Sequence, residues 1–262
     1  MTKNILTNFW MWLGLVALLL VLIVARVPAS FAAYAFTQAI PGLSLAEVQG
    51  SLWAGSAGSA LLSVERDVYS LGRFQWRLKP LSLLTFKPCA NISFAFQSQS
   101  AKGDVCAAGE QVQLANFNVN VPAELLDLWF ATTLAGDLSL VVNKGTINGL
   151  RVEALDGNLS WRNGALLNGD SWIALGTFGA NLTADNQGGV NAELVDLGGP
   201  VIADLDINYN RILRPNDPIG VIIKGEIGVR DSAHPELQKF LPTMASAIGE
   251  ETERGYAIEW QQ

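Results

Sequence analysis

Apolar and polar residues alternate with a period of two through most of the chain beyond its N-terminal segment. In residues 73–79, Phe74, Trp76 and Leu78 fall on one side and charged or amide side chains on the other. Residues two apart lie on the same face of a β-strand, so this pattern predicts strands with one apolar and one wet face. About twelve such segments occur, which predicts an all-β fold built as a curved antiparallel meander or roll.

Turn signals separate the predicted strands. They are glycine dipeptides that favour tight hairpins, namely Asn148-Gly149, Asp156-Gly157, Asn163-Gly164, Asn168-Gly169 and Gly188-Gly189.

Helix signals are few and short in the same region. Residues 80–84 predict one turn, and residues 121–130 begin like a helix, with a proline near the first turn. Residues 234–251 carry apolar side chains at three-to-four spacing and predict a C-terminal helix, followed by a last strand at 256–260.

The N-terminus has a different pattern, a long apolar run. Residues 9–25 are 17 residues without a charge. With its flanks, such a helix spans roughly 30 Å at about 1.5 Å per residue, which matches a bilayer core. We therefore expect a transmembrane helix over 9–26. The alternative is a cleaved signal peptide, for which Ser30-Phe31-Ala32 offers a weak cleavage site.

This run sets the expected domain organisation. A short tail over 1–8 lies in the cytoplasm, because a brief tail and a long polar remainder favour that orientation. A stalk over 27–33 follows the helix. The β-rich domain then spans 34–262, outside the cytoplasm.

Two glycine–tryptophan stretches suggest an internal repeat. Residues 50–55 read GSLWAG, and residues 157–164 read GNLSWRNG. Each precedes alternating strands, so we expect two similar β-meanders at about 34–135 and 136–262. The tryptophans are expected to pack on the apolar face where glycine lets the backbone approach closely.

The composition and motifs of the chain argue against nucleic-acid binding, a zinc site and catalysis. The net charge is −7 with no basic arm, so nucleic-acid binding is not expected. One histidine, His234, and two cysteines are too few for a structural zinc site. No phosphate loop or nucleophile elbow is present. Asp204 and Asp206 share a strand face, which is read as a solvated acidic surface or half of a cation site. We expect no enzyme activity, catalytic residue, metal or cofactor.

The two cysteines flank a predicted hairpin. The midpoint between Cys89 and Cys106 falls in a polar turn, so folding there sets the pair roughly opposite each other. Antiparallel Cα separations of about 4.5–5.5 Å match disulfide geometry. A disulfide is expected, with two free buried thiols as the alternative.

Several stretches together resemble the type II secretion system protein N family (general secretion pathway protein N). They are the N-terminal apolar run, LAEVQGSLWAGSA (45–57), QWRLKPLSLL (75–84), GDLSL (136–140), DGNLSW (156–161), the Leu-Pro helix at 241–242 and GYAI (255–258). The motif positions to which we give structural roles are Gly50, Leu52, Trp53, Gly55, Trp76, Pro80, Gly136, Gly157, Trp161 and Gly255.

The resemblance implies a single-pass inner-membrane protein of Gram-negative bacteria with its bulk in the periplasm. It would be a non-catalytic accessory or assembly component, making protein–protein contacts with other secretion subunits during export of folded proteins. Unpaired edge strands near Trp53 and Trp260 are the expected docking sites.

The chain also distantly resembles AsmA-type envelope proteins. That resemblance implies an alternative function, in which an apolar β-groove holds or transfers lipid.

Overall fold

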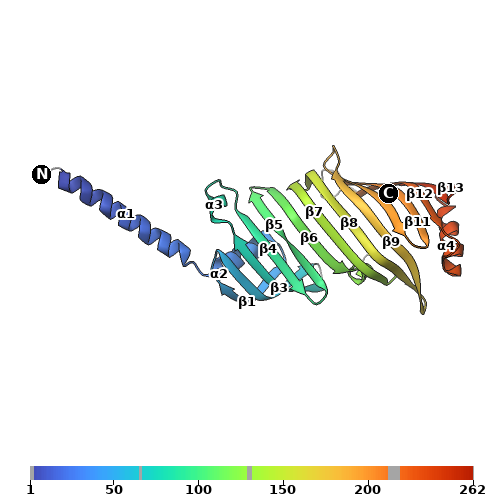
Figure 1. The fold of residues 1–262 in the computed structure, drawn as a ribbon, viewed down its shortest axis with the longest axis horizontal. Helices are drawn as coiled ribbons and strands as arrows, with labels where there is room; N and C mark the ends of the chain where they lie inside the picture. Colours follow the sequence, from blue (N-terminus) through green and yellow to red (C-terminus); the bar gives the residue numbers. More distant parts are fainter. Residues whose placement is uncertain (1–2, 65–66, 129–131, 212–218, 262) are drawn as a thin grey trace. The chain divides into compact units, whose positions relative to one another are not determined.

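The computed structural model describes the backbone of residues 3–64, 67–128, 132–211 and 219–261 (Figure 1). Within these ranges, the structure does not describe the side chains of residues 3–10, 20, 64, 67, 128, 211 and 219. The chain forms two compact units, unit 1 (Met1–Gln97) and unit 2 (Ser98–Gln262). Antiparallel strands dominate both units, as the alternation predicts.

In unit 1, the residues that the structure describes form three helices and four strands. In chain order they are α1 (Lys3–Ala25), α2 (Ala29–Ala39), β1 (Leu43–Gly50), β2 (Ala54–Val64), β3 (Asp67–Leu78), α3 (Pro80–Leu83) and β4 (Cys89–Phe96). The strands pair with their sequence neighbours in the order β1-β2-β3-β4. α3 forms where the sequence predicts a single helical turn.

The helix α1 covers residues 9–25 of the membrane span predicted over 9–26. Among the described residues, no helix is both long enough and apolar enough to cross a bilayer. The side chains of residues 9, 10 and 20 of the predicted span lie outside the described residues.

The core of unit 1 forms where α2 packs on the sheet. Ala29 and Ala32 of α2 are buried against Phe74 and Trp76 of β3. Phe36 of α2 meets Phe74 edge-on, with ring centroids 5.2 Å apart. Residues 29–33 of the predicted stalk thus form the first part of α2, and their alanines make a small apolar helix face that packs on the aromatic side chains. The stalk over 27–33 stays a prediction.

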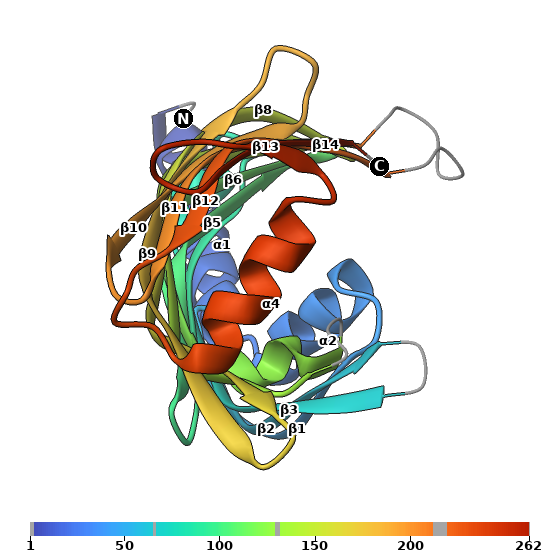
Figure 2. The same cartoon turned by 90° about the vertical axis from the view of Figure 1, so that its right-hand side faces the viewer.

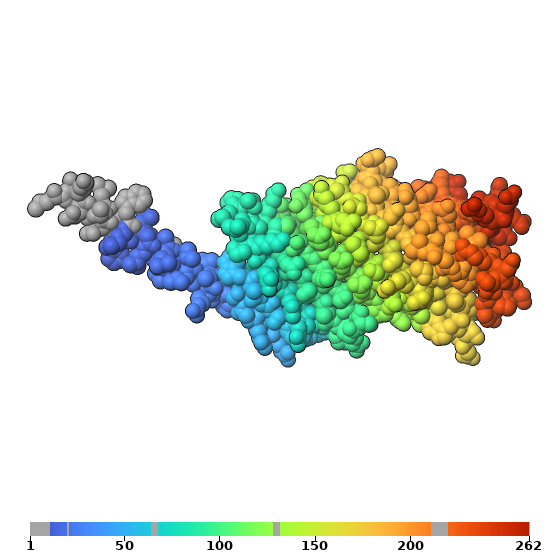
Figure 3. Space-filling view, in the orientation of Figure 1, coloured from blue at the N-terminus to red at the C-terminus, as the bar shows by residue number. Residues whose placement is uncertain are grey.

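The described residues of unit 2 form ten strands. They are β5 (Gln99–Ala108), β6 (Gln111–Pro122), β7 (Leu134–Asn148), β8 (Arg151–Asn168), β9 (Ser171–Ala184), β10 (Val190–Gly198), β11 (Val201–Arg211), β12 (Ile219–Val229), β13 (Gly249–Glu251) and β14 (Tyr256–Gln261). Their order follows the sequence up to β12 and ends β12-β14-β13. The colours of Figure 3 show this succession across the surface of the unit.

Two short helical segments accompany these strands, the 3-10 helix η1 (Ala123–Leu128) and the helix α4 (Pro235–Ala245). Figure 2 shows α4 lying across one face of the last strands. Its Leu237 is buried with Ile173, Phe178 and Val201 of the sheet. We call this set the α4 cluster and the sheet face that it covers the inner face.

Two predicted helices differ from the structure. The helix predicted at 121–130 is wrong at its start, because β6 continues to Pro122 and only η1 follows; residues 129–131 lie outside the described residues. Val121 pairs with Leu138 of β7, so this residue belongs to the sheet and does not begin a helix. The helix predicted at 234–251 ends at Ala245, and the last residues form β13.

The compact units meet in sequence at Gln97 and Ser98, whereas the predicted halves divide between residues 135 and 136. The internal repeat at 34–135 and 136–262 therefore stays a prediction about related segments.

Candidate binding surfaces

In unit 1, the glycine–tryptophan motif forms a close packing contact between β2 and β3. The indole N–H of Trp76 donates to the carbonyl oxygen of Leu52 at 3.1 Å. A Cβ at Gly55 would lie 2.4 Å from a ring carbon of Trp76, so only glycine fits beside the ring. Trp53 lies outside this core and donates its indole N–H to the carbonyl oxygen of Val24 at 2.9 Å.

Unit 2 contains the same arrangement. The indole N–H of Trp161 on β8 donates to the carbonyl oxygen of Ala135 on β7 at 3.1 Å. A Cβ at Gly136 would lie 2.9 Å from the indole nitrogen. Trp161 lies 5.8 Å from Phe178, and Trp76 lies 5.6 Å from Phe74, both at 34° between ring planes. By its contacts, Trp76 is the counterpart of Trp161, although the sequence match aligns Trp161 with Trp53.

The remaining motif positions lie at the ends of elements, in a turn or within a strand. Gly50 ends β1, Pro80 begins α3, Gly157 lies buried in β8, and Gly255 lies in the turn between β13 and β14. None of these four carries a side chain with acid–base or nucleophilic chemistry.

The two cysteines of the chain, Cys89 and Cys106, are both disulfide-bonded. Cys89 begins β4, and Cys106 lies in β5. The predicted disulfide is confirmed.

The inner face of unit 2 carries continuous apolar rows across its strands. One row follows the strand register through Ala101, Val119, Leu140, Leu159, Ala180, Leu194, Leu205, Gly225 and Ile258. Leu194 and Leu205 pack against the α4 cluster. Val119, Leu140 and Leu159 are half-buried and belong to neither of the two hydrophobic clusters of the described residues.

The opposite face of unit 2 is acidic near its last strands. Asp206 pairs with Glu193 and Lys224, and Asp204 pairs with Glu226, all on this outer face. Asp204 and Asp206 are exposed, as expected for a solvated acidic surface. Among the described residues, no group of three or more His, Cys, Asp and Glu side chains is arranged to hold a metal ion.

The single histidine caps a helix. His234 precedes α4, and its Nδ1 accepts a hydrogen bond from the backbone N–H of Glu236 at 3.4 Å. Pro235 follows at the first helical position, where the missing N–H has no helical partner. This side chain therefore satisfies a free backbone donor at the start of α4.

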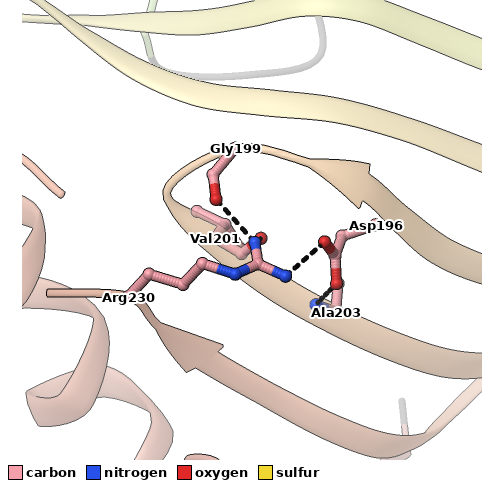
Figure 4. Close-up of polar contacts among 5 residues, drawn as sticks. All are labelled: Asp196, Gly199, Val201, Ala203 and Arg230. Carbon is pink, nitrogen blue, oxygen red and sulfur yellow. Dashed lines mark hydrogen bonds and ion pairs between the residues drawn. The ribbon is translucent and has the colours of Figure 1, made fainter. Parts of the chain in front are cut away.

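Sequence reasoning missed a polar contact that fixes the entry to α4 (Figure 4). The guanidinium of Arg230 donates to the carbonyl oxygens of Gly199 and Val201 and to Asp196 at 2.7 Å. Asp196 also accepts from the backbone N–H of Ala203. The Arg230 contact therefore ties the β10–β11 hairpin to the segment that leads into α4. Its signal in the sequence is only a lone arginine after a strand, which carries no pattern.

A second such contact shapes the β9–β10 turn. Asp185 accepts from the backbone N–H groups of Gln187 at 2.7 Å and Gly189 at 2.6 Å. Burial raises the pKa of Asp185, but these backbone hydrogen bonds outweigh it, so the pKa lies below its usual value. The ionised carboxylate is thus the form that holds the turn.

Strand edges are present in both units. β1 pairs with β2 on one side, and among the described strands no partner lies on its other side. Glu47 of β1 has a φ of 57°, and neither it nor Gly58 opposite it appears in the register, so the ladder is locally interrupted at this edge while the register on both sides stays the same. The three residues of β13 form the last strand of unit 2 beside β14.

These features define a class of protein: an open antiparallel β-sheet with one apolar and one polar face and with exposed strand edges. Within that class, the chain matches the family model of type II secretion system protein N over residues 41–258, and it belongs to this family. It is therefore a component of type II secretion, and the family implies association with other secretion subunits. No curated protein and no solved structure matches the chain.

Proposed function

We propose that this protein is a non-catalytic assembly component of the type II secretion system. In this proposal it is anchored in the inner membrane by residues 9–26, its body lies in the periplasm, and it contacts other secretion subunits. The observation that carries the proposal is the family match over residues 41–258.

Side-chain exposure on α1 supports the membrane anchor. Met11, Trp12, Leu18 and Leu22 are each more than half exposed, as are other large apolar residues of this helix. A helix that is apolar all round needs an apolar surrounding, which a bilayer supplies.

The strand edges support docking to protein partners. An edge strand presents unpaired backbone groups that a partner strand can meet. The eight residues of β1 offer the longer edge, and exposed Ser44 lies on it. Exposed Glu250 marks the edge at β13.

A deletion strain tests the proposal. The strain is complemented with the wild-type chain, and exported protein in the culture medium is measured. Loss of export in the deletion strain and its recovery are expected. Normal export without the protein would reject the assembly function.

Site-specific photocrosslinking tests the edges separately. A crosslinker at Ser44 or Glu250 is expected to capture another secretion subunit. The matched control is exposed Asn158, which lies on the central strand β8, where both edges are paired. Equal capture from Asn158 would argue against edge docking.

The half-buried row Val119–Leu140–Leu159 favours a second candidate function, lipid binding on the inner face of unit 2. Apolar side chains left partly open to water are a natural contact for acyl chains. Native mass spectrometry of the gently purified protein would detect bound phospholipid. A Leu140→Glu variant should lose this lipid, whereas Thr183→Glu on the outer face should keep it. A lipid-free wild-type protein would reject this function.

A further inference from the structure

A short loop of unit 1 exposes unusually large apolar side chains. Residues 80–88 connect β3 to β4 and include α3, which projects from the ends of these strands (Figure 1). Leu81 and Leu84 are each 77% exposed, and Phe86 is 90% exposed. Exposed apolar clusters of this kind mark surfaces that contact a protein or a membrane.

The loop holds these side chains outward in a fixed conformation. The backbone N–H of Lys79 donates to the carbonyl oxygen of Cys89 at 2.8 Å and closes the base of the loop. The hydroxyl of Ser82 accepts from the N–H of Cys89 and donates to the carbonyl oxygen of Lys79. Phe86 has a φ of 56°, a conformation that favours glycine. A large aromatic residue at such a position, almost fully exposed, points to a role for the ring outside the fold.

The charge around the loop is positive in an otherwise acidic protein. Unit 1 contains seven Lys and Arg against three Asp and Glu, whereas unit 2 contains ten against twenty-one, so their formal charges are +4 and −11. No acidic residue occurs between Asp67 and Asp104. Arg77 and Lys87, both exposed, lie on either side of the loop. A basic surface around apolar side chains complements an anionic lipid surface.

Contacts within unit 1 connect the loop to the apolar helix α1. The indole N–H of Trp53 donates to the carbonyl oxygen of Val24, near the end of α1. The carbonyl oxygen of Trp53 accepts from the N–H of Leu78 at 2.7 Å, and Leu78 lies two residues before α3. Trp53 is therefore hydrogen-bonded both to the end of α1 and to Leu78, just before the loop.

We infer that residues 80–88 insert into the interface of an anionic bilayer, with Leu81, Leu84 and Phe86 among the acyl chains and Lys87 at the headgroups. The inference rests on the membrane anchoring of the proposed function, because α1 would bring the loop to that surface. A lipid surface fits better than a protein pocket because the three side chains project outward from a loop rimmed by cations. Interfacial apolar groups of this kind sit about 5–10 Å into the headgroup and acyl boundary.

The test places an environment-sensitive fluorophore on a new cysteine in the full-length chain. Both native cysteines are in a disulfide, so a Leu84→Cys variant labels at one position under non-reducing conditions. The matched control is Leu150→Cys, because Leu150 is also apolar and 52% exposed but lies in the β7–β8 turn of unit 2. Each labelled protein is reconstituted into vesicles of phosphatidylethanolamine with phosphatidylglycerol and into vesicles of phosphatidylcholine.

In phosphatidylglycerol vesicles, we expect blue-shifted emission from the label at position 84 and several-fold quenching by bromine-labelled acyl chains. The label at position 150 should keep its aqueous emission. In phosphatidylcholine vesicles, or with Lys87→Glu added, quenching at position 84 should fall at least twofold.

A label at position 84 that stays aqueous in reconstituted protein would overturn the inference, as would a label shielded only after a secretion subunit is added. Quenching that is equal in both vesicle types would also overturn the anionic-surface assignment. Export by the Leu84→Ser/Phe86→Ser variant is measured in the complemented deletion strain. Normal export together with an aqueous label would reject loop insertion and leave the assembly function intact.

Discussion

The indole N–H of Trp161 donates to the carbonyl oxygen of Ala135 across the β7–β8 pair, 3.1 Å away. Unit 1 repeats this contact between Trp76 and Leu52. In both places a glycine on the neighbouring strand leaves room for the ring, and a phenylalanine on the next strand or the same strand packs beside it. The family motif thus places one tryptophan side chain in contact with the glycine-containing segment beside it.

Replacing Trp161 with phenylalanine is expected to lower the free energy of unfolding by about 1–2 kcal/mol. The ring packing is largely kept, but a hydrogen bond to a partly buried carbonyl is lost. Urea denaturation followed by circular dichroism measures the change. Trp53→Phe is the matched control and should cost less, because Trp53 lies outside the aromatic core. Equal losses for the two variants would contradict the assigned roles.

Replacing Arg230 with lysine is expected to destabilise the protein by about 1 kcal/mol. A single ammonium group cannot reach the acceptors on Gly199, Val201 and Asp196 together. Hydrogen exchange should also quicken in α4, since Arg230 fixes the segment before it.

The exposed ion pair between Lys224 and Glu259 is the control for Arg230. Its side chains are 56% and 71% exposed, so Lys224→Ala should change stability by less than about 0.5 kcal/mol. If Arg230→Lys proves as mild as Lys224→Ala and leaves α4 exchange unchanged, the Arg230 contact does not organise this region.

Replacing Cys89 and Cys106 together with serine is expected to lower stability by about 3 kcal/mol. The disulfide closes an 18-residue loop, which restricts the unfolded chain. The far-ultraviolet circular dichroism spectrum should keep its β-sheet form. Thermal melts with and without reductant provide the check: reductant should shift the wild type and leave the double variant unmoved. A double variant that melts like the oxidised wild type would show that the bond is dispensable.

The free energy of unfolding should depend on pH through the carboxylate of Asp185. Because hydrogen bonds hold the pKa of Asp185 below the unfolded value of about 3.9, the carboxylate stabilises the folded protein above that pH. This contribution is lost as the pH falls below about 4 and passes through the folded pKa.

An Asp185→Asn variant should therefore be less stable than the wild type by about 1 kcal/mol at pH 7. The difference should shrink towards zero in strong acid, as urea melts over a pH series would measure. Asp170→Asn, in the exposed β8–β9 turn, is the control variant for the removal of one carboxylate. A constant deficit for Asp185→Asn at every pH would contradict the role of the charge.

Alternation predicted most of the strands because burial of one sheet face imposes a period of two. It predicted Phe74 and Trp76 on the apolar face of β3, where both are buried. It failed at β13, because three residues, Gly249–Glu251, are too short to show a period. Helix α2 was missed because alanines are read as neutral. The signal was present at Ala29, Ala32, Ala33 and Phe36, whose spacing matches one helix face.

The site was harder to predict than the fold. The glycine–tryptophan match in the sequence aligns Trp53 with Trp161. In the structure, however, Trp76 makes the contacts that correspond to those of Trp161. Which strands pair, and in which register, is not visible in a single sequence. The Arg230 contact depends on acceptors some 30 residues away in the sequence. By contrast, the disulfide was predictable because only two cysteines exist and a turn lies between them.

The order of the last strands has a consequence for synthesis. Up to β12, each strand of unit 2 pairs with the strand made just before it, so the sheet can lengthen while the chain is still being made. β13 breaks this rule, because it pairs only with β14, and β14 lies between β12 and β13. The edge of β12 therefore has no partner strand until Tyr256–Gln261 have been translated. β14 covers this edge of β12, so a chain cut before Tyr256 would leave unpaired backbone groups there, open to aggregation or to recognition by proteases.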